Sequence, residues 1–160
     1  MSKTNRKVHK VLVLGAGEAG KSTLMTALCE RAVNLEVGGR TVAMDHGMIR
    51  RDGRSISMVG LPGQERFAGV REALLSGSAA AVWVLRASVG PDATSVELLR
   101  QLQVPYLVLI NQRIGEEAGP PFEPLNGLPV PSAVLDGNLV NPADGFLQTL
   151  ENAIWDLVND

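Results

Sequence analysis

Short apolar runs alternate along the chain with segments in which apolar residues recur every three or four positions. The first pattern is typical of β-strands and the second of amphipathic helices. Two of the runs, residues 79–85 and 106–110, are apolar at every position, which is typical of strands covered by helices on both faces. The alternation therefore predicts βαβ units around a mostly parallel sheet, in the α/β fold class.

The predicted elements follow one another from end to end without an internal repeat. We expect strands at residues 8–14, 41–49, 54–61, 79–85, 106–110 and 130–135, and helices at residues 21–32, 64–75, 92–102 and 142–158. Pro142 is suited to the first turn of the last helix. Asp52-Gly53 favours a two-residue type I′ hairpin turn between the second and third strands, so one strand should run antiparallel to the others.

The segment between residues 111 and 129 contains four prolines and cannot hold a long helix. Together these elements predict a three-layer architecture. About six strands should form the sheet, and helices should cover both faces. The helix between the last two strands should be shortened or lost.

Composition narrows the class of protein. A chain of 160 residues with 45% hydrophobic and 20% charged residues is expected to form one domain, spanning residues 1–160. A net charge of −2 and 4% aromatic residues give no basic patch or stacking platform, so we expect no nucleic-acid partner. No apolar run reaches the roughly 18 residues of a membrane span, and acceptors for lipidation are missing. The sequence thus predicts a cytoplasmic protein without a direct membrane anchor.

The strongest motif starts at Gly15, where the chain fits the phosphate-binding pattern G-x-x-x-x-G-K-[ST] between a predicted strand and a predicted helix. Backbone N–H groups of such a loop surround phosphate oxygens, the lysine reaches the β- and γ-phosphates, and the hydroxyl ligates Mg²⁺. The nucleotide-binding residues predicted here are Gly15, Ala16, Gly17, Glu18, Ala19, Gly20, Lys21, Ser22 and Thr23. Lys21 is also expected to act in catalysis, and Ser22 to hold the metal. The motif predicts a P-loop NTPase.

A second motif covers residues 60–67, Gly-Leu-Pro-Gly-Gln-Glu-Arg-Phe, which resembles the second switch of Ras-like small GTPases. The resemblance implies that Gly63 binds the γ-phosphate and that Gln64 orients the attacking water, so both are candidate catalytic residues. Thr41 follows Lys21 by twenty residues, where the family places a threonine that binds nucleotide and Mg²⁺. An ordinary strand-entry residue is the alternative for Thr41.

The amino-acid sequence of these motifs is similar to that of prokaryotic MglA-like small GTPases, which are associated with Roadblock-type proteins. This resemblance implies a Ras-like G domain and a Roadblock-type regulator or effector as protein partner. It runs from about residue 8 to residue 67 in sequence and continues to the C-terminus only in architecture.

The chain departs from this family at the metal site, where Gly60 replaces the second-switch aspartate. If the hairpin has a two-residue turn, Asp45 lies opposite Gly60 on the same face of the sheet. We hypothesise that Asp45 replaces the missing carboxylate as a metal ligand. A solvated strand residue is the alternative.

A second departure concerns the base. The family reads Asn-Lys-x-Asp where this chain reads Asn111-Gln112-Arg113-Ile114. Asn111 and Gln112 are therefore candidate nucleotide-binding residues, but Ile114 cannot accept the two hydrogen bonds that guanine gives to the aspartate. Guanine preference is implied by kinship alone. Glu116 or Glu117 either enters the site from the following loop or is solvated, and Asp136-Gly137-Asn138 stands where the family contacts the base edge.

The sequence as a whole predicts a small GTP-binding protein that holds GTP or GDP with Mg²⁺, hydrolyses GTP slowly and acts as a molecular switch. Turnover should be slow unless an arginine is supplied; Arg40 is either such a group or an exposed loop charge. One alternative is a degenerate nucleotide-binding interaction module without effective hydrolysis. A second alternative is a P-loop NTPase that uses ATP.

Overall fold

The computed structural model describes residues 8–29, 33–37, 40–60, 76–117, 119 and 121–159. The predicted helix at residues 64–75, together with Gly63 and Gln64, lies outside the described residues, as do the side chains of Thr41 and Asp45. Within the described residues no helix is long and apolar enough to cross a membrane.

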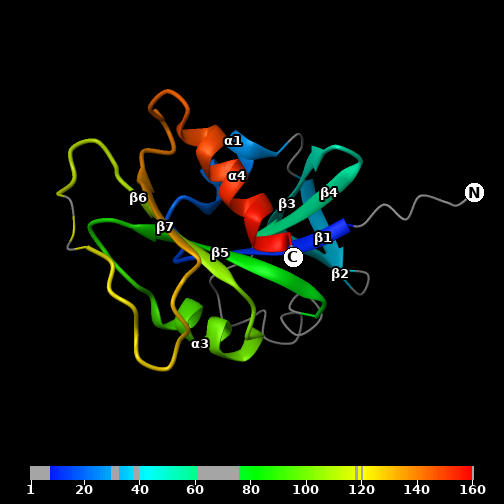
Figure 1. Cartoon of the computed structure of the whole chain (residues 1–160), viewed down its shortest axis with the longest axis horizontal. Coiled ribbons are helices and arrows are strands. Elements are labelled where there is room, and N and C mark those ends of the chain that lie inside the picture. The colour runs from blue at the N-terminus through cyan, green and yellow to red at the C-terminus, as the bar shows by residue number, and fades with distance from the viewer. Residues whose placement is uncertain are drawn as a thin grey trace, which may run out of the picture.

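One seven-stranded sheet forms the centre of the molecule, in the order β2-β3-β4-β1-β5-β6-β7 (Figure 1). Its strands are β1 (Val8–Leu14), β2 (Val33–Val37), β3 (Arg40–Arg51), β4 (Arg54–Gly60), β5 (Ser78–Arg86), β6 (Tyr106–Asn111) and β7 (Ala133–Gly137). β3 is antiparallel to both β2 and β4, and the other neighbouring strands are parallel. The predicted sheet, mostly parallel with one antiparallel strand, is confirmed.

β2 is the additional strand that the sequence analysis did not predict. Its residues alternate between apolar and polar, which is typical of a strand with one buried face. The strand is only five residues long and lies at the edge of the sheet, paired with β3. Its identity as a strand therefore depends on that single neighbour.

Three described helices complete the layers: α1 (Lys21–Leu28), α3 (Ala93–Leu102) and α4 (Phe146–Val158). α1 and α4 cover one face of the sheet and α3 covers the other (Figure 1). This arrangement confirms the predicted three-layer fold with helices on both faces. No helix occurs among the described residues between β6 and β7, as the prolines of that segment predicted.

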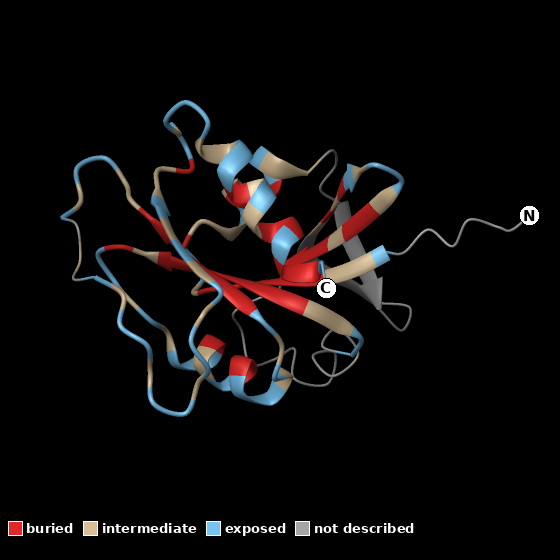
Figure 2. Ribbon diagram, in the orientation of Figure 1, coloured by how far each residue is buried: buried red, intermediate tan, exposed pale blue. Residues whose placement is uncertain are grey.

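The core consists of two apolar clusters, one on each side of the sheet. Successive strand residues point to opposite faces, so Val11 and Val13 of β1 pack toward α1 and α4, whereas Leu12 and Leu14 pack toward α3. The central strands are accordingly buried along most of their length, while the outer surfaces of the helices are exposed (Figure 2). Both faces of the central strands are therefore buried, as the all-apolar strands predicted.

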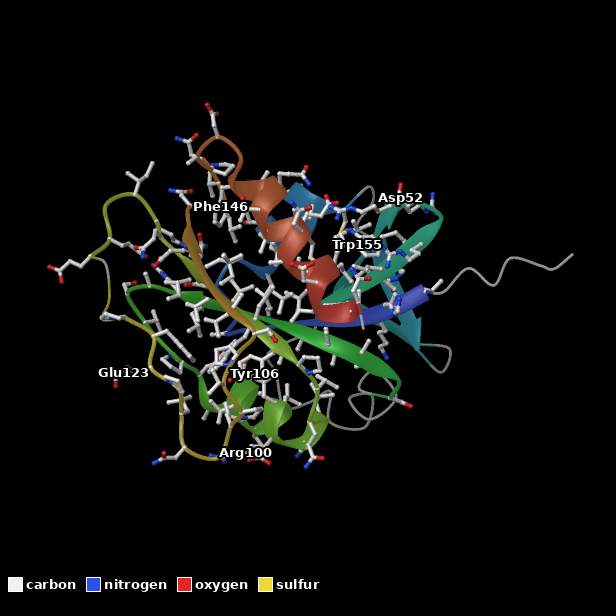
Figure 3. All side chains as sticks on the ribbon, viewed as in Figure 1. Asp52, Arg100, Tyr106, Glu123, Phe146 and Trp155 are labelled. Carbon is white, nitrogen blue, oxygen red and sulfur yellow. The ribbon has the colours of Figure 1, made fainter. Side chains whose placement is uncertain are left out.

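The hairpin between β3 and β4 follows the predicted turn. Asp52 and Gly53 both have positive φ, 51° and 78°, as a type I′ turn requires. Six residue pairs, from Arg51–Arg54 to His46–Val59, follow the predicted register. The hairpin around Asp52 lies near the end of α4 that carries Trp155 (Figure 3). The guanidinium carbons of Arg51 and Arg54 lie 5.4 and 5.1 Å from the ring centroid of Trp155.

Three predicted boundaries are wrong by three residues or more. α1 ends at Leu28 rather than at residue 32. β7 begins at Ala133, which pairs with Leu107, so it starts three residues later than predicted. α4 begins at Phe146, so Pro142 precedes the helix. A turn over residues 143–146 replaces the predicted first turn: the backbone N–H of Phe146 donates to the oxygen of Ala143 at 3.0 Å, and Gly145 has a positive φ of 81°.

Candidate functional site

The predicted phosphate loop connects β1 to α1 through residues 15–20, and glycines at both of its ends are required by the fold. Gly15 has a φ of +151°, and a Cβ there would lie 2.6 Å from the backbone oxygen of Val84. Gly20 has a φ of +117°, and a Cβ there would lie 2.5 Å from Nδ2 of Asn111. Any side chain at either position would displace the loop.

Lys21 and Ser22 lie in the first turn of α1. Nζ of Lys21 donates a 2.7 Å hydrogen bond to the backbone oxygen of Gly15, so the side chain lies across the loop. Ser22 is exposed. No acidic residue occupies this first turn, so the partial positive charge of the helix end is not opposed by a carboxylate there. An anion on the loop would meet the helix end and the ammonium group together.

The remaining residues of the predicted loop differ in exposure. Gly17 and Glu18 are exposed, Ala16, Gly20 and Thr23 are half-buried, and Gly15 and Ala19 are buried. The backbone N–H of Ala19 donates to the oxygen of Ala16 at 3.0 Å, which closes the loop on itself.

Asn111 ends β6 and links the loop to the rest of the site. Its side chain is buried, and Nδ2 donates to the backbone oxygen of Ala19 at 3.0 Å. Its Oδ1 accepts from the backbone N–H of Leu139 at 3.2 Å. The structure therefore brings this predicted residue against the phosphate loop and against the segment that follows β7.

Gln112 is held by the end of β7. Its backbone N–H donates to the oxygen of Gly137 and its Nε2 to Oδ1 of Asp136, both at 2.8 Å. Ile114 is 82% exposed. Asp136 belongs to the tripeptide that stands where the family contacts the base edge, and no local pattern in the sequence pointed to its contact with Gln112.

Charged residues gather beside the loop at the end of β5. Nε of Arg86 lies 3.0 and 3.1 Å from the two carboxylate oxygens of Glu116, and Nη1 lies 3.4 Å from the carboxylate of Glu18. The hydrogen bond from Arg86 lowers the pKa of Glu116, and Glu116 in turn raises the pKa of Arg86. Arg113 donates to the backbone oxygen of Glu18. Glu116 is thus ion-paired, whereas Glu117 is exposed.

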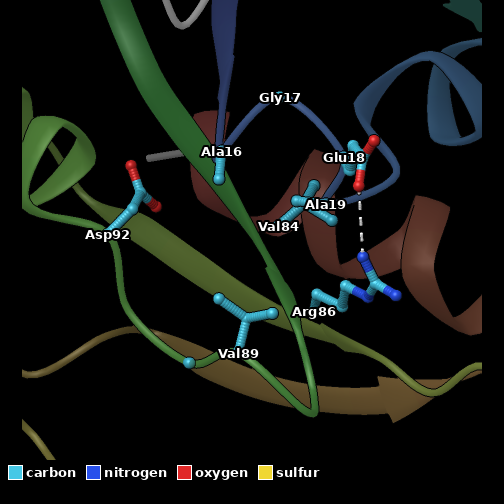
Figure 4. Close-up of a pocket in the computed structure, with 9 residues that line it drawn as sticks. Ala16, Gly17, Glu18, Ala19, Val84, Arg86, Val89 and Asp92 are labelled. Atoms are coloured by element: carbon cyan, nitrogen blue, oxygen red, sulfur yellow. Dashed lines mark hydrogen bonds and ion pairs between the residues drawn. The ribbon is translucent and has the colours of Figure 1, made fainter. Parts of the chain in front are cut away.

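A hollow of about 280 Å³ lies between the loop and the start of α3 (Figure 4). It is lined by Ala16, Gly17, Glu18, Ala19, Val84, Arg86, Val89, Gly90 and Asp92. The carboxylate of Asp92 accepts from the backbone N–H of Ser95 at 3.0 Å and from Nε1 of Trp83 at 3.1 Å. Asp92 therefore caps α3 and fixes one wall of the hollow.

The donor set at the start of α1 suits Mg²⁺. This cation takes oxygen ligands and is usually bound by one or two protein groups together with substrate phosphates. The exposed hydroxyl of Ser22 next to the phosphate loop fits that requirement. No three His, Cys, Asp or Glu side chains come together as a metal site in the described part of the chain.

A mostly parallel sheet with a strand–loop–helix phosphate cradle defines a P-loop nucleotide-binding domain, and here a buried asparagine joins the cradle to the end of β6 and to the segment after β7. Residues 10–112 match the family described as 50S ribosome-binding GTPase. The chain belongs to this GTPase family, and its fold is that of a G domain.

The chain is also similar in sequence to two other proteins. The chain is 38% identical over 106 residues to an uncharacterized protein of Methanocaldococcus jannaschii. The aligned region covers 64% of this chain and 69% of that protein. It is 28% identical over 114 residues to translation initiation factor IF-2 of Fusobacterium nucleatum, covering 69% of this chain and 16% of that factor.

Solved structures show the same fold. Translation elongation factor SelB of Methanococcus maripaludis, in complex with the GTP analogue GppNHp, has a TM-score of 0.70 at 17% identity, covering 99% of this chain and 35% of that protein. The G domain of the FeoB iron transporter of T. maritima has a TM-score of 0.67 at 21% identity, covering 95% of this chain and 99% of that domain. The chain thus spans about a third of SelB and nearly the whole FeoB G domain.

Proposed function

We propose that this chain is a small GTPase that binds GTP or GDP with Mg²⁺ on residues 15–22 and hydrolyses GTP slowly. The observation that carries the proposal is the position of Lys21. This residue starts α1, and its ammonium group lies 2.7 Å from the backbone oxygen of Gly15, across the loop. A triphosphate in this loop would accept hydrogen bonds from the lysine and from the backbone N–H groups, and would also be attracted by the positive end of the helix. Membership of a GTPase family supports guanine as the base.

Mg²⁺ would neutralise charge that develops on the phosphate oxygens. Ser22 is proposed as one ligand, and Thr41 and Asp45 of β3 as two more. The register of β3 with β4 supports Asp45, because the pair His46–Val59 is one step from Asp45–Gly60. Gly63 and Gln64 are proposed to contact the γ-phosphate and the attacking water, as their sequence motif implies.

The proposal includes a switch. Contacts of the γ-phosphate with the segments around Thr41 and Gly63 would change the surface offered to a protein partner when GTP is hydrolysed. A Roadblock-type regulator or effector, and a cytoplasmic location, rest on the sequence resemblance and on the composition of the chain. Binding of the purified chain to a Roadblock-type protein in the presence of GDP or of a non-hydrolysable GTP analogue tests this part.

The central test identifies the nucleotide released when the purified chain is denatured and then follows phosphate release from GTP and ATP with Mg²⁺. A Lys21→Met variant should lose affinity for GTP by about 10–100-fold, because charge-assisted hydrogen bonds to phosphate are lost. Lys10→Met is the matched control, since Lys10 lies in β1 and donates to the backbone oxygen of Ser76 at 3.0 Å, away from the loop. Equal affinities in the two variants contradict the proposal.

A degenerate binding module is the second candidate, and the exposed Ile114 in the base motif favours it. Guanine nucleotide that is bound but never cleaved would support this candidate. Release of adenine nucleotide alone would instead support an ATP-using enzyme.

A further inference from the structure

The ends of β6 and β7 lie side by side next to the phosphate loop (Figure 1). Ile110 pairs with Asp136 and Asn111 pairs with Gly137, while the side chain of Asn111 reaches the oxygen of Ala19 in the loop. Ligands of parallel α/β sheets bind outside the carboxyl ends of the strands. A nucleotide with its phosphates on the loop therefore has its base within reach of these two strand ends.

The carboxylates near this edge of the sheet differ in their exposure and in their hydrogen-bond and ion-pair partners. Glu18 and Glu116 share the guanidinium of Arg86. Glu117 is exposed and lies beyond Ile114 in the loop after β6. Asp136 is also exposed, but it lies in β7, one residue before the strand ends, and is oriented by a hydrogen bond from Nε2 of Gln112 to its Oδ1 at 2.8 Å.

The second oxygen of Asp136, Oδ2, has no hydrogen-bond partner among the residues that the structure describes. An ionised carboxylate is an acceptor only, and its two oxygens carry about four lone-pair sites. It can therefore keep the hydrogen bond from Gln112 and still accept hydrogen bonds from a ligand with neighbouring donors.

Guanine has such neighbouring donors, the N1–H and the 2-amino group, on its Watson–Crick edge. Adenine has an unprotonated N1 at the same edge, which a carboxylate repels. We propose that Asp136, positioned by Gln112, is the residue that recognises the guanine edge in this chain, where the base motif carries Ile114. The inference rests on the proposed function, because it assigns the base contact of the same nucleotide site.

The test measures the affinities of the whole chain for GDP and for IDP with Mg²⁺ by calorimetry. IDP has hypoxanthine as its base, which lacks only the 2-amino group of guanine. The wild-type chain should prefer GDP by about tenfold or more, as expected for a hydrogen bond to a charged acceptor.

Asp136→Asn has nearly the same shape but leaves one acceptor oxygen for Gln112 and both base donors, and its amide N–H₂ opposes the 2-amino group. The GDP preference of this variant should fall to nearly one. Asp144→Asn is the matched control, because Asp144 is an exposed carboxylate in the segment between β7 and α4, and it should keep the wild-type preference.

The failures of the two proposals can be told apart. If Asp136→Asn keeps the full GDP preference with an unchanged melting temperature, or if the wild-type chain binds GDP and IDP equally, the role of Asp136 is wrong and the nucleotide site stands. If the wild-type chain binds neither nucleotide, the proposed function is wrong as well.

Discussion

The side-chain amide of Asn111 donates a hydrogen bond to the backbone oxygen of Ala19, 92 positions earlier in the chain, at 3.0 Å. The other end of the same amide accepts from the backbone N–H of Leu139. One buried side chain thus joins the phosphate loop, the end of β6 and the segment after β7. The part of the site proposed for phosphates and the part proposed for the base are therefore held in a fixed relation.

Replacement of Asn111 by alanine should lower the free energy of unfolding by about 1–3 kcal/mol, because the backbone N–H of Leu139 and the oxygen of Ala19 lose their partner in a buried place. Urea denaturation measures this loss. Asn126→Ala is the control, since Asn126 is exposed and its hydrogen bond with Arg100 uses the backbone oxygen. Equal losses in both variants would show that the amide of Asn111 does not stabilise the fold.

Two glycines of the phosphate loop should respond differently to alanine. Gly20→Ala should cost about 1–3 kcal/mol, since its φ of +117° is unfavourable for a side chain and its Cβ would meet Nδ2 of Asn111. Gly17→Ala should change stability by less than about 0.5 kcal/mol, because a Cβ at Gly17 has no neighbour within 4 Å. Thermal unfolding of both variants without nucleotide checks the difference, and the reverse order of the two would contradict it.

Asp92 should stabilise α3 through two separate contacts. Asp92→Ala removes the cap on Ser95 and the partner of the Trp83 indole, for an expected loss of about 2–4 kcal/mol in the free energy of unfolding. Asp92→Asn has a single acceptor oxygen for these two donors and should lose less. Urea denaturation with tryptophan fluorescence follows both variants. The interpretation fails if the asparagine variant is the less stable of the two.

The ion pair between Arg86 and Glu116 should make stability depend on acid. The hydrogen bond from Arg86 lowers the pKa of Glu116 in the folded chain below its ordinary value of 4.5, so the folded state binds this proton more weakly than the unfolded state does. The contribution of Glu116 is therefore present above about pH 4.5 and is lost as pH falls through the lower folded value.

Glu116→Gln should accordingly be less stable than the wild-type chain at pH 7, and the difference should shrink toward pH 3. Urea midpoints across this range measure it. Glu117→Gln is the control, because Glu117 is exposed and makes no ion pair among the described residues. A constant difference between Glu116→Gln and the wild-type chain at every pH would contradict the linkage.

Several features followed from local chemistry and could be predicted. Asp52-Gly53 predicted the hairpin turn and its register, because few residues adopt positive φ in succession. The all-apolar runs predicted β5 and β6, because an interior strand has no exposed face. The glycines of the phosphate loop predicted a strand-to-helix turn, and β1 ends just before it and α1 begins just after it, as expected.

Other features depended on distant partners and were missed or misplaced. β2 is a strand because β3 lies beside it. β7 begins at Ala133, where it pairs with Leu107 of β6, rather than at residue 130. Glu116 could be read from the sequence as a solvated acid, but the end of β5 brings Arg86 against it. Local propensity has no information on contacts of this kind.

By itself, the sequence determined the α/β class, the phosphate loop with Lys21 and Ser22, and the hairpin register, because each depends on residues close together in the chain. Only the tertiary structure decided that Asn111 fastens the loop to β6, that Arg86 pairs with Glu116, and that Gln112 lies against Asp136. These contacts join residues from different strands and loops. They form only when the order of strands in the sheet brings β1, β5, β6 and β7 to one edge, where their carboxyl ends meet.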